Sequence, residues 1–125
     1  MPINELFDIR KFDEYREDNR REVKKAKDSL PASIWETYSA FANCYGGVII
    51  LGVKENTDGS WHATGITRPS KLLKEFWDTI HNYTTVSINI LTEKNVATYQ
   101  DEKSGNVIIV IMVPPAKREH KPVYI

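Results

Sequence analysis

The run of residues 33–55 constrains the fold most, because an apolar helical pattern leads directly into an apolar, β-branched run. Apolar residues in its first half recur every three or four positions, so one helix face would carry Ile34, Tyr38, Phe41, Ala42 and Tyr45. Gly46 and Gly47 would end this helix, because glycine adopts the left-handed conformation without a Cβ penalty. Residues 48–53, VIILGV, have the composition of a strand buried on both faces. We therefore expect the core to begin here.

The sequence allows two starts for this helix. Ser29 is one candidate cap, with Pro31 in the first turn, where its missing N–H would have had no partner. Ser33 is the other, with Glu36 three residues later completing a capping box. In both cases we expect the helix to end near Cys44.

Length and composition indicate a single domain over residues 1–125, since a chain of this size can bury roughly two-thirds of its unfolded surface. The single cysteine, Cys44, excludes an internal disulfide, so we expect a reducing compartment, the cytoplasm. No signal-peptide pattern is present, and no apolar run approaches the ~18 residues of a membrane span. We therefore expect a soluble protein with no membrane partner.

The N-terminal residues are rich in charge. Residues 3–15 would form a short amphipathic helix or an arm that packs on a neighbour. In the highly charged stretch that follows, a short edge strand at residues 21–25 would turn Val23 inward and leave Glu22 and Lys24 outward.

The middle of the chain contains a hairpin signal and a second helix signal. Asp58 and Gly59 favour a tight turn after the buried strand, with residues 61–64 as the returning strand. Ser70 would cap a helix over residues 71–82. The apolar stripe of this helix comprises Leu72, Leu73, Phe76, Trp77 and Ile80.

Strand signals fill the C-terminal third. Alternation predicts a half-buried strand through Val86, Ile88 and Ile90. Residues 96–100 and 106–113 would form a hairpin, and the second of these runs, NVIIVIMV, should be a central strand.

Common catalytic signatures are absent. The sequence contains no GxxxxGK[ST], GxGxxG, HExxH or GxSxG pattern. The glycine pair is better explained as a helix stop than as a phosphate cradle, because a helix C-terminus carries the wrong dipole sign for an anion. Cys44 at a helix end lacks the dipole that activates a thiol. The three histidines, which have no partner at ligand spacing, are His62, His81 and His120.

Two sets of charged residues are candidates for function. Glu17 and Glu22, approached by the acids after the buried strand, Glu55 and Asp58, could hold Mg²⁺ or Mn²⁺ and activate water; the alternative is a salt-bridged surface. Basic and acidic residues both number 17, so nucleic-acid binding would depend on charge placement. The basic residues that could contact phosphates are Arg16, Arg20, Arg21, Lys24, Lys25, Lys27, Lys117, Arg118 and Lys121.

Several of these residues form a pattern known from a protein family. The pattern reads E-x-x-x-x-E-x-K, then A-F-A-N, then G-G and an apolar strand ending in G-V. The matching positions are Glu17, Glu22 and Lys24; Ala40, Phe41, Ala42 and Asn43; Gly46 and Gly47; Gly52 and Val53. It continues through Gly65-Ile66 and the ending IIVIMVPPAKREHKPVYI. The chain thus resembles the Schlafen-type, AlbA-like domain, named for presumed DNA binding, of bacterial and archaeal transcriptional regulators.

The resemblance implies an α+β fold in which two main amphipathic helices pack on a mixed β-sheet, as the N-terminal part of a longer regulator. It also implies nucleic acid, with DNA expected, as the partner. In animal Schlafen proteins a related domain cleaves RNA with two glutamates spaced like Glu17 and Glu22 and an aspartate after the G-V strand. That third position reads Lys54-Glu55 in this chain.

Three functional hypotheses follow. The first is a DNA-binding domain that regulates transcription and needs no cofactor. The second is a nuclease that uses Mg²⁺ or Mn²⁺ at Glu17, Glu22 and Glu55. The third is an assembly module that forms a homo-oligomer through its edge strand or its N-terminal arm.

Overall fold

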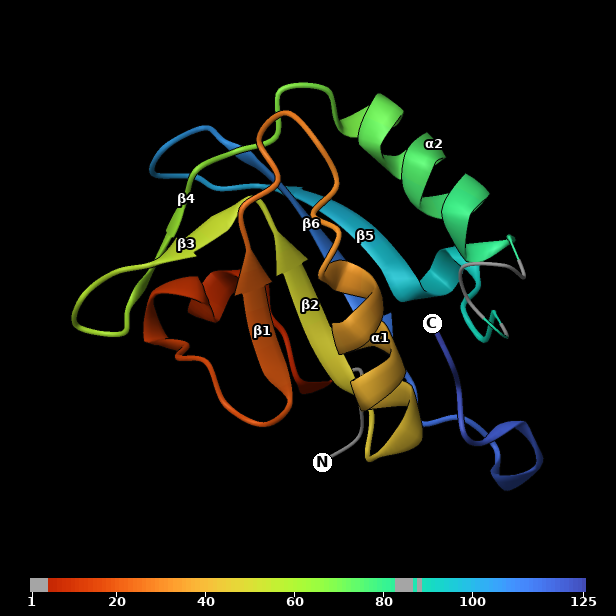
Figure 1. The fold of residues 1–125 in the computed structure, drawn as a ribbon. Helices are drawn as coiled ribbons and strands as arrows, with labels where there is room; N and C mark the ends of the chain where they lie inside the picture. Colours follow the sequence, from red (N-terminus) through yellow and green to blue (C-terminus); the bar gives the residue numbers. More distant parts are fainter. Residues whose placement is uncertain (1–4, 83–86, 88) are drawn as a thin grey trace.

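A four-stranded sheet lies at the centre of the computed structural model, which describes residues 5–82, 87 and 89–125 (Figure 1). The strands, in the spatial order β1-β2-β6-β5, are β1 (Arg21–Lys24), β2 (Gly47–Leu51), β6 (Val107–Val113) and β5 (Val96–Gln100). β1 is parallel to β2, whereas β6 is antiparallel to β2 and to β5, so the sheet is mixed. The predicted central strands, β2 and β6, therefore lie at its centre.

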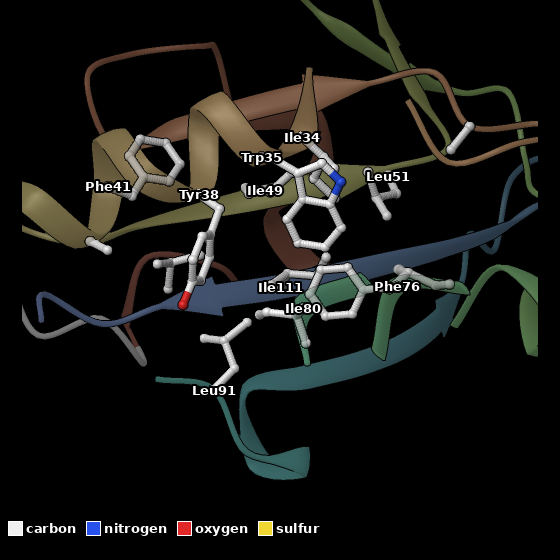
Figure 2. Close-up of a cluster of buried hydrophobic side chains, with 14 of the residues drawn as sticks. Ile34, Trp35, Tyr38, Phe41, Ile49, Leu51, Phe76, Ile80, Leu91 and Ile111 are labelled. Atoms are coloured by element: carbon white, nitrogen blue, oxygen red, sulfur yellow. The ribbon is translucent and has the colours of Figure 1, made fainter. Parts of the chain in front are cut away.

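Two helices, α1 (Ile34–Asn43) and α2 (Pro69–Ile80), pack on one face of this sheet. Figure 2 shows their side chains meeting Ile49, Leu51 and Ile111 of the central strands. The rings of Trp35 in α1 and Phe76 in α2 stack with their centroids 5.4 Å apart. The expected α+β fold, with two main helices on a mixed sheet, is confirmed.

The N-terminal segment and a hairpin cover the opposite face. They contain the 3₁₀ helix η2 (Ile9–Glu14) and the strands β3 (Val53–Glu55) and β4 (Trp61–Ala63), which pair with each other. The side chains buried there are Leu6, Phe7, Phe12, Val48, Ile50, Val53, Trp61, Ala63, Ile108 and Val110. Within its described part, the predicted N-terminal arm thus packs on its own sheet.

The predicted helix stop is confirmed at Gly46. Its φ is +79°, and its N–H donates to the Phe41 carbonyl at 2.9 Å. The prediction that Tyr45 lies on the buried helix face is wrong, since Tyr45 is 78 % exposed. The helix ends at Asn43, so its period does not extend to Tyr45. The N-cap residue is Ser33, but its side chain makes no capping bond, and neither predicted cap forms.

Two further boundaries differ from prediction. Residues 48–53 do not form one strand, because Gly52, with φ +88°, turns the chain from β2 into β3. The second helix starts at Pro69, with Arg68 as N-cap residue, so Ser70 lies inside the helix. Proline suits the first helical position because its φ is already helical and no N–H is needed there.

The described residues also contain two short 3₁₀ helices, η3 (Glu93–Asn95) and η4 (Arg118–His120). Of the strand predicted through Val86, Ile88 and Ile90, the first two residues lie outside the described part of the chain, and Ile90 is in no strand. Among the residues that are described, no helix is long and apolar enough to cross a membrane.

Candidate functional site

Glu17 lies at the free edge of β1. One of its carboxylate oxygens accepts the Val23 N–H at 3.0 Å, and the carboxyl group also shares a hydrogen bond with Glu55 of β3. Partial burial of the otherwise exposed side chain raises the pKa of Glu17, and the hydrogen bond with Glu55 raises it further, while the Val23 N–H acts in the opposite direction. The structure therefore brings together two of the three predicted carboxylates.

Glu22 is held on the other side of β1, facing α1. Its Oε2 accepts a hydrogen bond from Thr37 Oγ1 at 2.5 Å and lies 2.9 Å from Lys24 Nζ. Lys24 Nζ also donates to Ser33 Oγ at 2.9 Å. Burial alone would raise the pKa of Glu22, but the hydrogen bonds from Thr37 and Lys24, with the Lys24 charge, hold it below its ordinary value.

This contact network corrects the predicted outward orientation of Glu22 and Lys24. Both side chains reach back to α1, and that of Lys24 is only 12 % exposed. Since α1 packs on the neighbouring strands β2 and β6, the face of β1 that carries Glu22 and Lys24 is directed toward Thr37 of α1 and Ser33 before it.

The arrangement does not fit a divalent cation. Within residues 5–82, 87 and 89–125, no three His, Cys, Asp or Glu side chains lie together so that they could hold a metal ion. Glu22 is paired with the ammonium group of Lys24, and Glu17 uses one oxygen for a backbone N–H. A metal that binds carboxylates would have to displace these partners.

Four of the predicted phosphate-binding residues are tied into the fold. Lys24 is held as described above. Arg20 donates to the carbonyls of Tyr45 at 2.9 Å and Gly46 at 3.3 Å. Arg21 lies 2.8 Å from Asp18 and donates to the Leu6 carbonyl at 2.7 Å. Arg16 donates to the Tyr15 carbonyl at 2.8 Å.

The other five are exposed, and no described residue forms an ion pair or a hydrogen bond with their charged groups. They are Lys25, Lys27, Lys117, Arg118 and Lys121. Figure 1 places them at two ends of the molecule, because the loop after β1 lies at the top and η4 at the lower right. The nine predicted residues therefore do not form one continuous face.

Sequence reasoning missed two basic residues beside Lys27. Arg68 and Lys71, at the start of α2, line with Lys27 an open pocket of about 390 Å³. The two loops are joined because the Thr67 N–H donates to the Lys27 carbonyl at 2.8 Å. The pocket also contains Asp28 and Glu75. A cation at a helix start is visible in the sequence, but its proximity to Lys27, which is distant along the chain, is a tertiary property.

The chain is similar to known proteins over most of its length. A family model described as Schlafen, AlbA_2 matches residues 13–124. A solution NMR structure from Nitrosomonas europaea, the N-terminal domain of a protein named as related to the ATP-dependent DNA helicase RecG, is 27 % identical with a TM-score of 0.68. That similarity covers 93 % of this chain and 76 % of the other. No curated protein matches the sequence.

Proposed function

The chain belongs to the Schlafen, AlbA_2 family, and from this premise we propose that it is a nucleic-acid-binding domain that contacts DNA. The observation that carries the proposal is the set of exposed lysines and arginines without a described ion-pair partner: Lys25, Lys27, Lys117, Arg118 and Lys121. The similar Nitrosomonas europaea domain belongs to a protein named for a DNA helicase, which also favours DNA.

In this proposal the domain is the N-terminal part of a cytoplasmic transcriptional regulator. Its net charge is zero, so attraction to DNA would be local rather than global. Phosphates would be contacted by the exposed cations, and Arg68 and Lys71 would act with Lys27 at one end. Arg16, Arg20, Arg21 and Lys24 would add charge near the contacts while holding the fold.

Fluorescence anisotropy with a labelled DNA duplex tests the proposal. We expect binding that weakens steeply between about 50 mM and about 200 mM salt, because each phosphate contact releases a counterion. Replacing Lys117, Arg118 and Lys121 together by alanine should reduce the slope of log K against log salt by about 0.9 for each phosphate that is no longer neutralised. Lys74→Ala is the matched control, since Lys74 pairs with Asp78 on α2. No binding at the lower salt concentration would sink the proposal.

A metal-dependent nuclease is the second candidate, favoured by the contact between Glu17 and Glu55. The pairing of Glu22 with Lys24 speaks against it. Incubating the protein and its Glu22→Ala variant with RNA and Mn²⁺ tests whether the protein is a nuclease. Cleavage that depends on Glu22 would support the nuclease, and equal cleavage by both proteins would eliminate it.

Self-assembly is a third candidate. Among described residues, β5 has a strand partner on one side only, and such an edge can pair with a second copy. Light scattering over a range of protein concentrations would reveal a dimer, and a constant monomer mass would exclude this candidate.

A further inference from the structure

Tyr45 is an aromatic side chain on the surface just past the end of α1. At 78 % exposure it is the most exposed large apolar residue in the described part of the chain. No described aromatic ring stacks on it. An exposed aromatic ring is the type of side chain on which the bases of single-stranded nucleic acids stack.

A basic loop of residues 117–121, here named the C-terminal basic loop, is anchored to the same end of α1. Before it, the Ala116 N–H donates to the Ala42 carbonyl at 2.7 Å. After it, the Val123 N–H donates to Asn43 Oδ1 at 2.6 Å, and Asn43 Nδ2 donates to the Val123 carbonyl at 3.0 Å. The loop therefore leaves and rejoins the last turn of α1, beside Tyr45.

Further contacts hold the backbone of this surface in place. Pro115 lies against Gly46, where a Cβ added to the glycine would be 3.0 Å from the proline ring. Arg20 donates to the carbonyls of Tyr45 and Gly46. These carbonyls follow the end of α1 directly, so the Arg20 charge lies near the negative end of the helix dipole and offsets the repulsion that a phosphate would meet there. The backbone at Tyr45 and the two ends of the basic loop are thus held in place by hydrogen bonds from separate parts of the chain.

We propose that Tyr45 and the C-terminal basic loop form a binding surface for single-stranded DNA. Tyr45 stacks on an unpaired base, while Lys117, Arg118 and Lys121 contact the adjoining phosphates. This inference rests on the proposed function and specifies its ligand as an unpaired strand. In a duplex each base face is covered by its neighbours, so a lone exposed ring finds a stacking partner only where bases are unpaired.

The experiment compares three labelled ligands by anisotropy: an oligothymidine of about 12 nucleotides, an oligouridine of the same length and a DNA duplex. For the oligothymidine, Tyr45→Ala should weaken binding about tenfold or more, whereas Tyr45→Phe, which keeps the ring, should bind like wild type. Removing the three loop charges should lower the salt slope by about 0.7 for each phosphate that is no longer neutralised. Lys94→Ala removes an exposed charge from η3 and should change neither the affinity for oligothymidine nor the salt slope.

A second readout is two-dimensional amide NMR during titration with oligothymidine. The largest changes in amide chemical shift should occur at residues 42–46 and 115–124. Equal affinity of wild type and Tyr45→Ala, binding to duplex alone, or tighter binding to oligouridine would each overturn this inference while leaving nucleic-acid binding intact. Absence of binding to all three ligands at low salt would overturn the proposed function itself.

Discussion

At the scale of single residues, Glu17 and Glu22 have opposite environments although they lie five positions apart. Glu17 shares a hydrogen bond with another carboxyl group, that of Glu55. Glu22 is paired with the ammonium group of Lys24 and receives a hydrogen bond from Thr37. Partial burial and the contact with Glu55 raise the pKa of Glu17, whereas the hydrogen bonds from Thr37 and Lys24 lower that of Glu22. Their contributions to stability therefore depend on pH in opposite directions.

Glu17→Gln should change this pH dependence. The pKa of Glu17 is higher in the folded protein than in the unfolded chain, where it is near the ordinary 4.5. Glu17 therefore contributes fully to folding stability below pH 4.5, and this contribution is lost as pH rises through the folded-state pKa. Glutamine cannot ionise and keeps an acceptor for Val23. We expect the variant to be more stable than wild type near neutral pH, by under about 1 kcal/mol because the site is exposed to solvent, and similar at about pH 4.

Urea unfolding at a series of pH values measures this difference. Glu93→Gln, which alters an exposed carboxyl group on η3, is the control and should follow the wild-type curve. Parallel curves for Glu17→Gln and wild type would contradict the expectation. Below the ordinary carboxyl range, wild type and variant should both lose the stability that Glu22 contributes, because its lowered pKa makes that contribution vanish on acidification.

At the scale of elements, the joint between α1 and β2 joins the helix layer to the sheet. Gly46 has a positive φ and lies so close to β6 that an added Cβ would stand 2.6 Å from the Val113 carbonyl oxygen. At Gly47 an added Cβ would stand 2.7 Å from the Phe41 ring. The two glycines therefore serve different needs, since the first allows the backbone turn and the second gives room to an aromatic side chain.

Gly46→Ala should destabilise the protein more than Gly105→Ala. Both glycines have positive φ, +79° and +74°, but nothing lies nearer than 4.0 Å to a Cβ at Gly105. We expect a loss in the free energy of unfolding of about 1 kcal/mol for Gly105→Ala, from backbone strain alone, and of about 3 kcal/mol or more for Gly46→Ala. Urea titrations of both variants measure the losses. Equal losses would show that the close approach of Gly46 to β6 does not affect the free energy of unfolding.

At the scale of the whole molecule, α1 is the element that unites distant parts of the chain. Thr37 in its N-terminal half and Ser33, the residue before it, contact β1, and its last turn holds the C-terminal segment through Asn43. The exposed basic residues consequently lie at opposite ends, one near the start of α2 and the other beside the end of α1 (Figure 1). Any nucleic-acid contact at these ends therefore depends on how α1 is packed.

Asn43→Ala should loosen the C-terminal segment. The change removes an acceptor and a donor for Val123 and leaves its N–H and carbonyl without these partners, which should cost about 2 kcal/mol. Trypsin should then cleave the C-terminal basic loop faster than in wild type. Ser39→Ala removes one hydrogen bond to the same carbonyl and should have a smaller effect. Unchanged cleavage of Asn43→Ala would contradict the role assigned to its side chain.

Local features were predictable because they depend on residues a few positions apart. The helix stop at Gly46, the hairpin turn at Asp58-Gly59 and the central position of the last strand all followed from short-range patterns. The errors had two causes. Tyr45 matched the helical period, but the helix ends before it. Lys24 was predicted to point outward, but its ammonium group contacts Glu22 and Ser33, and the contact with Ser33 is distant along the chain.

The sequence by itself determined the family, the α+β class and the identity of the charged candidates, since these reside in composition, spacing and motif. Only the tertiary structure decided which charged side chains are already paired with other groups of the protein. Arg20, Arg21 and Lys24 bind carbonyls, carboxylates or hydroxyls of the fold, and Glu17, which precedes β1, meets Glu55 of β3. The physical reason is that ion pairs and hydrogen bonds act over a few ångströms in space, whereas the partners here lie up to tens of residues apart along the chain.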